Sequence, residues 1–233
     1  IYDMLDSKLV NNFTIGINDD VTFLSLPKSD YYIDLNTKEI KIYGFGSDGM
    51  VSAAKNMLNI VHNNLDYFVQ GYFEYDSKKS GGVTICHLRL SNKKINAPFY
   101  VENPSLIVIT KDEYFKKIDM LENVKENAYV LINTIKNEEE LNRFLPQNVK
   151  QTILKKHLNV NILNAEKIAF ENNLNGKISK IIEVNILNIL NVKSAKELII
   201  KSIKDAFTTK GEDIVNNNIN AVNSSLSSIK KVN

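Results

Sequence analysis

Cysteine and histidine are scarce in this sequence, and their scarcity excludes several kinds of site. The chain of 233 residues contains one cysteine, Cys86, and three histidines. A single cysteine cannot form an internal disulfide, which favours a protein of a reducing compartment such as the cytoplasm. One cysteine and three scattered histidines also cannot complete a closed zinc site or ligate an iron–sulfur cluster within this chain.

The sequence also lacks long apolar runs and an excess of charge of one sign. No apolar run approaches the roughly 20 residues that a helix needs to cross a bilayer. The opening Ile1-Tyr2-Asp3 places an acid where a signal peptide would be basic, so no signal peptide is expected. The 29 basic and 27 acidic residues leave a net charge of +2. This balance gives no electrostatic reason to expect nucleic acid or a membrane as a partner.

What is present is the pattern of an α/β domain. Residues 1–37 are predicted to be an irregular lead-in, because turn-forming residues interrupt short β-like runs. A strand is predicted over 38–43, and it ends in a glycine-rich turn. A helix follows over 50–62, where apolar residues recur on one face. Strand, glycine turn and helix in this order form the start of a βαβ unit.

The rest of the chain alternates strands and helices and then becomes helical. Further strands are predicted over 67–75, 83–90, 105–110, 128–133 and 160–163. We expect one face of the strand over 83–90 to be exposed to solvent, and a helix within 138–157. From Ala165 the pattern is helical to the end, with Ser194 as an N-cap. Residues 38–233 are therefore predicted to form one three-layer α/β/α domain, with a mainly parallel sheet and a helical C-terminal part.

The glycine-rich turn is the first candidate site. Its spacing is Gly44-x-Gly46-x-x-Gly49, with Ser47 and Asp48 inside the turn. Glycines let backbone N–H groups approach a phosphate, and the following helix offers the positive end of its dipole. Asp48 suits such a site if its side chain caps the helix or points away. The alternative is a tight βα connection that binds nothing.

The polar turn between the strands over 67–75 and 83–90 is the second candidate site. Lys78, Lys79 and Ser80 lie in it, beside two glycines. Two lysines and exposed amides can hold an anionic group, although a solvated hairpin turn has the same composition. Two phosphate-friendly turns on neighbouring strands favour one shared anionic ligand.

No further residues form a recognisable catalytic set. We find no Ser/His/Asp combination, no metal-ligand spacing and no P-loop. Cys86 lies inside a predicted strand and is expected to be a buried structural thiol. Asn133 and Asn164 end predicted strands, where each is either a ligand contact or a turn residue. The residues by themselves predict a phosphate-bearing ligand and no catalytic residue within this chain.

Several stretches resemble one enzyme family, the single-chain pyruvate:ferredoxin or pyruvate:flavodoxin oxidoreductases. The resemblance is strong over residues 12–90 and is carried by Asn12-Phe13-Thr14-Ile15-Gly16-Ile17-Asn18-Asp19-Asp20, by Tyr43-Gly44-Phe45-Gly46-Ser47-Asp48-Gly49, and by Tyr75-Asp76-Ser77-Lys78-Lys79-Ser80-Gly81-Gly82 with His87-Leu88-Arg89. In that family these stretches lie in the third, gamma-type domain.

The resemblance implies an enzyme that decarboxylates pyruvate and forms acetyl-CoA, with electrons passing to ferredoxin or flavodoxin. It implies CoA at this domain, and thiamine diphosphate, Mg and 4Fe-4S clusters on other domains of the same polypeptide, in a homodimer. By resemblance, Gly46, Ser47, Asp48 and Gly49 would lie near the CoA pyrophosphate. Lys78, Lys79 and Ser80 would lie near the adenosine phosphates. The excised domain would be inactive.

Two alternatives come from other functional classes. The domain could be a scaffold that holds the thiamine-binding domains together and contributes little to CoA binding. It could also be a nicotinamide-dependent Rossmann-type dehydrogenase. Against the second, Glu74 and Asp76 fall later than the ribose-binding acid of such enzymes, which is usually about 20 residues after the glycines. No second substrate domain or catalytic acid/base is evident either.

Overall fold

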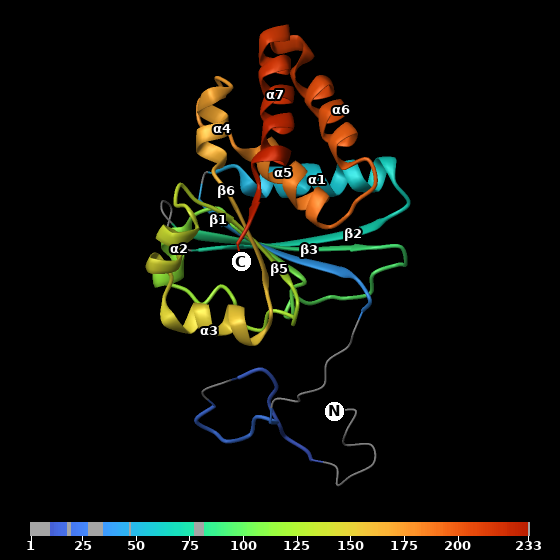
Figure 1. Ribbon diagram of the computed structural model, residues 1–233. Helices are drawn as coiled ribbons and strands as arrows, with labels where there is room; N and C mark the ends of the chain where they lie inside the picture. The colour runs from blue at the N-terminus through green and yellow to red at the C-terminus, as the bar shows by residue number, and fades with distance from the viewer. Residues whose placement is uncertain (1–9, 18–19, 28–34, 47, 77–81, 233) are drawn as a thin grey trace. The chain divides into compact units, whose positions relative to one another are not determined.

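The computed structural model describes residues 10–17, 20–27, 35–46, 48–76 and 82–232, and the chain divides into two units (Figure 1). In the first unit, Ile1–Leu35, the described residues form an isolated bridge between Thr14 and Ser25 and no helix. The second unit, Asn36–Asn233, holds the sheet and the helices. In the described part of the chain, no helix is long and apolar enough to cross a membrane.

The second unit alternates strands and helices in its first part and is mostly helical in its last third. Its strands are β1 (Lys38–Phe45), β2 (Phe68–Tyr75), β3 (Val83–Ser91), β4 (Leu106–Ile109), β5 (Tyr129–Asn133), β6 (Asn159–Leu163) and β7 (Lys230–Lys231). Its α-helices are α1 (Met50–Asn64), α2 (Glu138–Phe144), α3 (Gln147–Lys155), α4 (Ala165–Glu171), α5 (Ser179–Ile189), α6 (Ala195–Phe207) and α7 (Glu212–Ser228). Two short 3-10 helices are η2 (Asp112–Lys116) and η3 (Thr208–Lys210).

The strands form a mixed sheet in the order β2-β3-β1-β4-β5-β6-β7. Neighbouring strands from β1 through β4 and β5 to β6 are parallel, whereas β3 and β7 run antiparallel to their neighbours. The predicted α/β/α class is therefore confirmed, with a sheet that is parallel in its centre and antiparallel at both ends. The unit β1-α1-β2 is a split βαβ unit, because β3 inserts between its two strands.

Helices cover both faces of the sheet and make two apolar cores. Figure 1 shows α1 and α4 to α7 on one side and α2 and α3 on the other. Along β4, Leu106 and Val108 are buried in the first core, and Ile107 and Ile109 in the second. This alternation follows from the period of two residues in a strand. Because both faces of β4 are covered, its sequence is fully apolar, as predicted for a central strand.

The helical prediction over 138–157 was wrong in one respect, because two helices occupy this segment. Leu145 is extended between α2 and α3, and Pro146 follows it. Proline disfavours a helical residue before it and has no N–H for the helical ladder, so the break falls here. The first helix starts with a capping box, in which the Asn137 side chain accepts from Glu140 N and the Glu140 carboxylate accepts from Asn137 N.

The prediction of helix up to the end of the chain was also wrong at its last residues. Lys230 and Lys231 form β7, which pairs with β6 at the sheet edge, and Val232 N donates to Val160 O. Local periodicity cannot reveal this pairing, because the partner lies about 70 residues earlier in the chain. Ser194 does occupy the N-cap position of α6, but its φ is 55° and its side chain makes no capping hydrogen bond.

The expected solvent-exposed face of β3 is instead buried. Arg89 is 1% exposed, and its guanidinium donates to Glu39 Oε1, Gln70 Oε1 and the carbonyl oxygens of Phe99 and Tyr100. Buried charges require such partners, because an unpaired ion loses its hydration without compensation. The polar residues that suggested exposure therefore attach the loop after β3 to the sheet.

Candidate functional site

The candidate site lies at the carboxyl ends of the parallel strands, next to β1. After β1 the chain crosses to the face covered by α1, whereas after β4 it crosses to the opposite face through η2, whose Tyr114 and Phe115 belong to the second core. The edge between β1 and β4 is therefore a topological switch point, the position where open α/β sheets bind ligands.

Asp48 organises the glycine turn. Its Oδ2 accepts from Phe45 N at 2.6 Å and from the Thr110 hydroxyl at 3.2 Å, and its Oδ1 accepts from Met50 N at 2.8 Å. Asp48 N in turn donates to Phe45 O at 2.9 Å. The carboxylate thus joins β1, the start of α1 and the end of β4. These contacts engage the carboxylate inside the protein.

The structure explains why residues 44 and 49 are glycines. A Cβ on Gly44 would lie 2.9 Å from Thr84 Oγ1 and 3.1 Å from Met50 Cβ, so the turn packs too closely for a larger residue. Gly49 has φ +80°, a left-handed conformation that costs other residues energy, and it occupies the N-cap position of α1. Gly46 lies between them, and its N–H donates to Gly82 O at 2.9 Å.

The two candidate turns lie next to each other. Gly46 belongs to the glycine turn and Gly82 to the end of the lysine-containing segment, so their hydrogen bond joins the two turns directly. Between them lies a pocket of about 390 Å³, lined by Phe45, Gly46, Asp48, Gly49, Met50, Val51, Ser52, Tyr75, Asp76, Gly82 and Thr84. We call this the glycine-turn pocket. Ser47, Lys78, Lys79 and Ser80 lie outside the described residues.

Tyr75 and Thr84 are among the lining residues that the sequence did not single out for this pocket. Tyr75 is the last residue of β2 and is 62% exposed. Thr84, in β3, is 7% exposed. The sequence could have pointed to Tyr75 through its position just before the turn that contains Lys78 and Lys79. Thr84 gave no signal, because threonine is common in strands.

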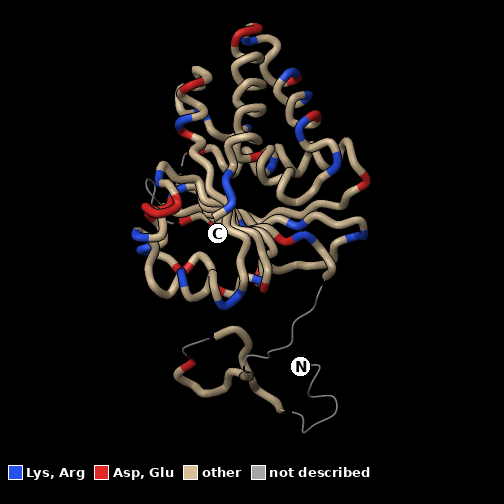
Figure 2. The backbone as a smooth tube through the Cα atoms, in the orientation of Figure 1, with Lys and Arg blue, Asp and Glu red and all other residues tan. Residues whose placement is uncertain are grey.

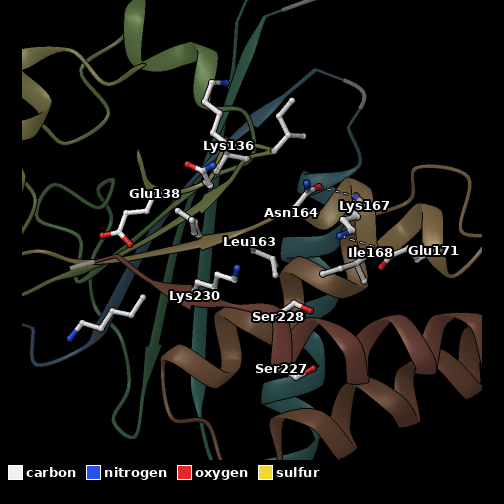
Figure 3. Close-up of a pocket in the computed structure, with 15 residues that line it drawn as sticks. Lys136, Glu138, Leu163, Asn164, Lys167, Ile168, Glu171, Ser227, Ser228 and Lys230 are labelled. Carbon is white, nitrogen blue, oxygen red and sulfur yellow. Dashed lines mark hydrogen bonds and ion pairs between the residues drawn. The ribbon is translucent and has the colours of Figure 1, made fainter. Parts of the chain in front are cut away.

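A second, larger pocket lies farther along the same sheet edge (Figure 3). Its volume is about 640 Å³, and its lining includes Thr134, Asn137, Glu138, Leu163, Asn164, Lys136, Lys167, Ile168, Glu171, Ser227, Ser228, Lys230 and Lys231. We call this the β5–β6 pocket. It shares no lining residue with the glycine-turn pocket among the described residues.

Most polar groups of the β5–β6 pocket already have partners. Lys136 Nζ is 3.0 Å from Asp112 Oδ2 and lies over the Phe144 ring, and Figure 3 shows it pointing away from Lys230. Lys167 and Glu171 form an exposed ion pair at 3.7 Å. The hydroxyls of Ser227 and Ser228 donate to Ser224 O in the preceding turn of α7.

Asn133 and Asn164, the two residues left open between ligand contact and turn, make structural hydrogen bonds. Asn133 Nδ2 donates to Thr110 O at 3.0 Å, and its Oδ1 accepts from Ala165 N at 2.9 Å. The Asn164 side chain accepts from Lys167 N and caps α4. These bonds tie the ends of β4, β5 and β6 together and fix the edge on which both pockets lie.

The remaining titratable candidates are structural. Cys86 is fully buried, and this burial raises the pKa of its thiol to about 12, so it is not a nucleophile at neutral pH. Burial also lowers the pKa of His87, which stacks on Tyr100 and lies 3.0 Å from Glu74 Oε1.

In the described part of the chain, no three His, Cys, Asp or Glu side chains are placed to hold a metal ion. Basic and acidic residues are interspersed along the described chain (Figure 2).

The fold is shared with known oxidoreductase subunits. Subunit PORC of the pyruvate oxidoreductase from Thermotoga maritima superposes with a TM-score of 0.68 over 84% of this chain and 99% of its own, at 19% identity. A 2-oxoglutarate:ferredoxin oxidoreductase from Magnetococcus marinus, solved with 2-oxoglutarate, coenzyme A and succinyl-CoA bound, superposes with a TM-score of 0.59. That match covers 82% of this chain and 30% of the other, at 13% identity.

Sequence comparison identifies the family. The chain is 37% identical to the pyruvate:ferredoxin oxidoreductase of Moorella thermoacetica over 228 residues, and 37% identical to a pyruvate dehydrogenase [NADP(+)] of Cryptosporidium parvum over 237 residues. The first match includes 95% of this chain but only 19% of the relative, and the second includes 99% of this chain but only 12% of the relative. A family profile described as pyruvate ferredoxin/flavodoxin oxidoreductase matches residues 39–228. This chain belongs to the pyruvate ferredoxin/flavodoxin oxidoreductase family.

Proposed function

We propose that this chain is the coenzyme A-binding domain of a pyruvate:ferredoxin or pyruvate:flavodoxin oxidoreductase. The intact enzyme would convert pyruvate and CoA to acetyl-CoA and CO2 and transfer two electrons to ferredoxin or flavodoxin. The names of the relatives support the reaction, and the small share of their length that this chain covers supports its assignment as one domain. The domain alone would be inactive.

One observation carries the assignment of CoA to this domain. The hydrogen bond between Gly46 and Gly82 brings the glycine turn and the lysine-containing segment together around one pocket. CoA has a pyrophosphate and a 3′-phosphate, so it needs two groups of anion-binding contacts. We place the pyrophosphate at the glycine turn, near the positive end of α1. We place the adenosine phosphates at Lys78, Lys79 and Ser80.

The internal use of Asp48 removes the main objection to a phosphate at this turn. Its carboxylate is held by Phe45 N, Met50 N and the Thr110 hydroxyl, so it stabilises the turn. Val51 and Ser52 line the pocket, and their N–H groups, in the first turn of α1, have no acceptor within the helix. They are the backbone donors that we assign to the pyrophosphate.

The other cofactors belong to other parts of the enzyme in this proposal. A 4Fe-4S cluster takes four cysteine ligands, and this chain has one cysteine, which is buried. Thiamine diphosphate and its Mg would likewise be bound elsewhere in the same polypeptide. The homodimeric state expected for the intact enzyme stays a prediction.

Calorimetric titration of this chain with CoA, dephospho-CoA and NAD at low ionic strength tests the proposal. We expect CoA to bind more tightly than dephospho-CoA, because the two differ in the 3′-phosphate that the lysines would hold. Equal affinity for the two would show that the lysines do not contact the 3′-phosphate. A preference for NAD, or no binding of CoA, would contradict the assignment of a CoA site to this domain.

A further inference from the structure

The glycine-turn pocket contains a buried hydroxyl without a hydrogen-bond partner. Thr84 lines this pocket and is only 7% exposed. Its Oγ1 has no hydrogen-bond partner among the described residues. A buried donor left unsatisfied is costly. Such a group in a pocket wall is explained if a ligand supplies the missing acceptor.

The sheet register places Gly44 and Tyr75 on either side of this hydroxyl. Thr84 pairs with Gly44 on β1 and with Tyr75 on β2, so the three residues form one row across the sheet. Gly44 has no side chain, and a Cβ there would lie 2.9 Å from Thr84 Oγ1. A side chain at residue 44 would therefore press against this hydroxyl and against Asp48, so only glycine fits beside Thr84.

Tyr75 ends this row with an aromatic ring. It is 62% exposed and lines the same pocket. Among the described residues, its ring stacks on no other ring and no cation lies over it. Its backbone is nevertheless held by pairing with Thr84, so the ring projects from a rigid strand end. An exposed, well-positioned aromatic ring beside anion-binding turns is suited to stack on a nucleobase.

We propose that Thr84 and Tyr75 are ligand-binding residues that recognise the adenine nucleotide end of the ligand. The Thr84 hydroxyl donates a hydrogen bond to a phosphate oxygen, and the Tyr75 ring stacks on the adenine. This inference rests on the proposed CoA site and makes the nucleotide half, and not the pantetheine arm, the part that this domain recognises.

Thr84→Val tests the hydroxyl, because valine has nearly the same shape. The free protein should keep or gain stability to urea, since an unsatisfied buried hydroxyl is removed. Affinity for CoA should fall about tenfold, the loss expected for one hydrogen bond to a charged group. A variant that is less stable and binds CoA as the wild type does would show that the hydroxyl has a structural role instead.

Tyr75→Leu and Tyr75→Phe test the stacking, with CoA, adenosine 3′,5′-bisphosphate and 4′-phosphopantetheine as probes in calorimetry. Tyr75→Leu should weaken CoA and the bisphosphate about tenfold. It should leave 4′-phosphopantetheine, which lacks adenine, unchanged. Tyr75→Phe should behave as the wild type, because the ring is retained. An equal effect of Tyr75→Leu on all three probes, or no effect on any, would overturn the stacking.

The three probes also separate this inference from the CoA assignment. If the wild-type chain binds the bisphosphate in a Tyr75-dependent way but does not bind CoA, the nucleotide contact holds and the CoA assignment fails. If it binds CoA and 4′-phosphopantetheine equally well and without dependence on Tyr75 or Thr84, the CoA assignment holds and this inference fails. If it binds none of the three, both fail.

Discussion

The two pockets on the carboxyl edge of the sheet differ in an instructive way. The β5–β6 pocket is the larger, at about 640 Å³, and four lysines are among its lining residues. The glycine-turn pocket measures about 390 Å³, and its described lining contains no lysine or arginine. By size and lysine count, the β5–β6 pocket would be the better anion site.

The hydrogen-bond and ion-pair partners of the polar groups favour the smaller pocket instead. In the β5–β6 pocket, Lys136 is paired with Asp112, Asn137 and Asn164 cap helices, and the serine hydroxyls bond to α7. In the glycine-turn pocket a buried hydroxyl and an exposed tyrosine ring have no such partners among the described residues. For this reason we propose the smaller pocket, and not the larger one, as the ligand site.

Replacing the side chain that organises the turn at each pocket should give the largest effect. Asp48→Ala should lower the free energy of unfolding by about 2–3 kcal/mol, because two backbone N–H groups lose a charged acceptor, and it should abolish CoA binding. Asn137→Ala removes the matching cap of α2 beside the β5–β6 pocket and should cost about 1 kcal/mol, with CoA binding retained. Urea denaturation and calorimetry measure both. Loss of CoA binding in Asn137→Ala would mean that the two pockets are coupled.

A pair of glycine variants should give an intermediate effect. Gly49 and Gly176 have φ +80° and +75°, and neither would bring a Cβ closer than 3.5 Å to its surroundings. Alanine at either position should therefore cost about 1–2 kcal/mol of stability through backbone strain. We expect weaker CoA binding in Gly49→Ala and normal binding in Gly176→Ala. Equal affinities in the two variants would make the glycine pattern incidental to binding.

Two lysine double variants should have the smallest effect on stability and give the most direct contrast between the pockets. Lys78→Ala with Lys79→Ala, and Lys167→Gln with Lys230→Gln, should each change the free energy of unfolding by no more than about 0.5 kcal/mol. The first pair should weaken CoA binding more than dephospho-CoA binding, and the second pair should change neither. If the second pair weakens CoA binding, the site belongs to the β5–β6 pocket.

Much of the fold could be predicted from local patterns. The strand before Gly44, the helix from Met50 and the apolar central strands follow from periodicity and turn residues, and all were found. The misses required distant information: β7 pairs with a strand far away in the sequence, and the buried side chain of Arg89 depends on a loop that follows it. Polarity alone indicated exposure for β3, whereas tertiary hydrogen bonds compensate its burial.

For the candidate site, the sequence by itself was enough to predict two anion-binding turns, one after β1 and one before β3, without a catalytic set. It determined these points because glycine spacing, turn lysines and the count of cysteines are local properties. The tertiary structure alone decided that the two turns meet through Gly46 and Gly82, and that Gly44, Thr84 and Tyr75 share one row. The physical reason is strand order: β3 inserts between β1 and β2, and only this pairing places a buried hydroxyl and an exposed ring on the wall of one pocket.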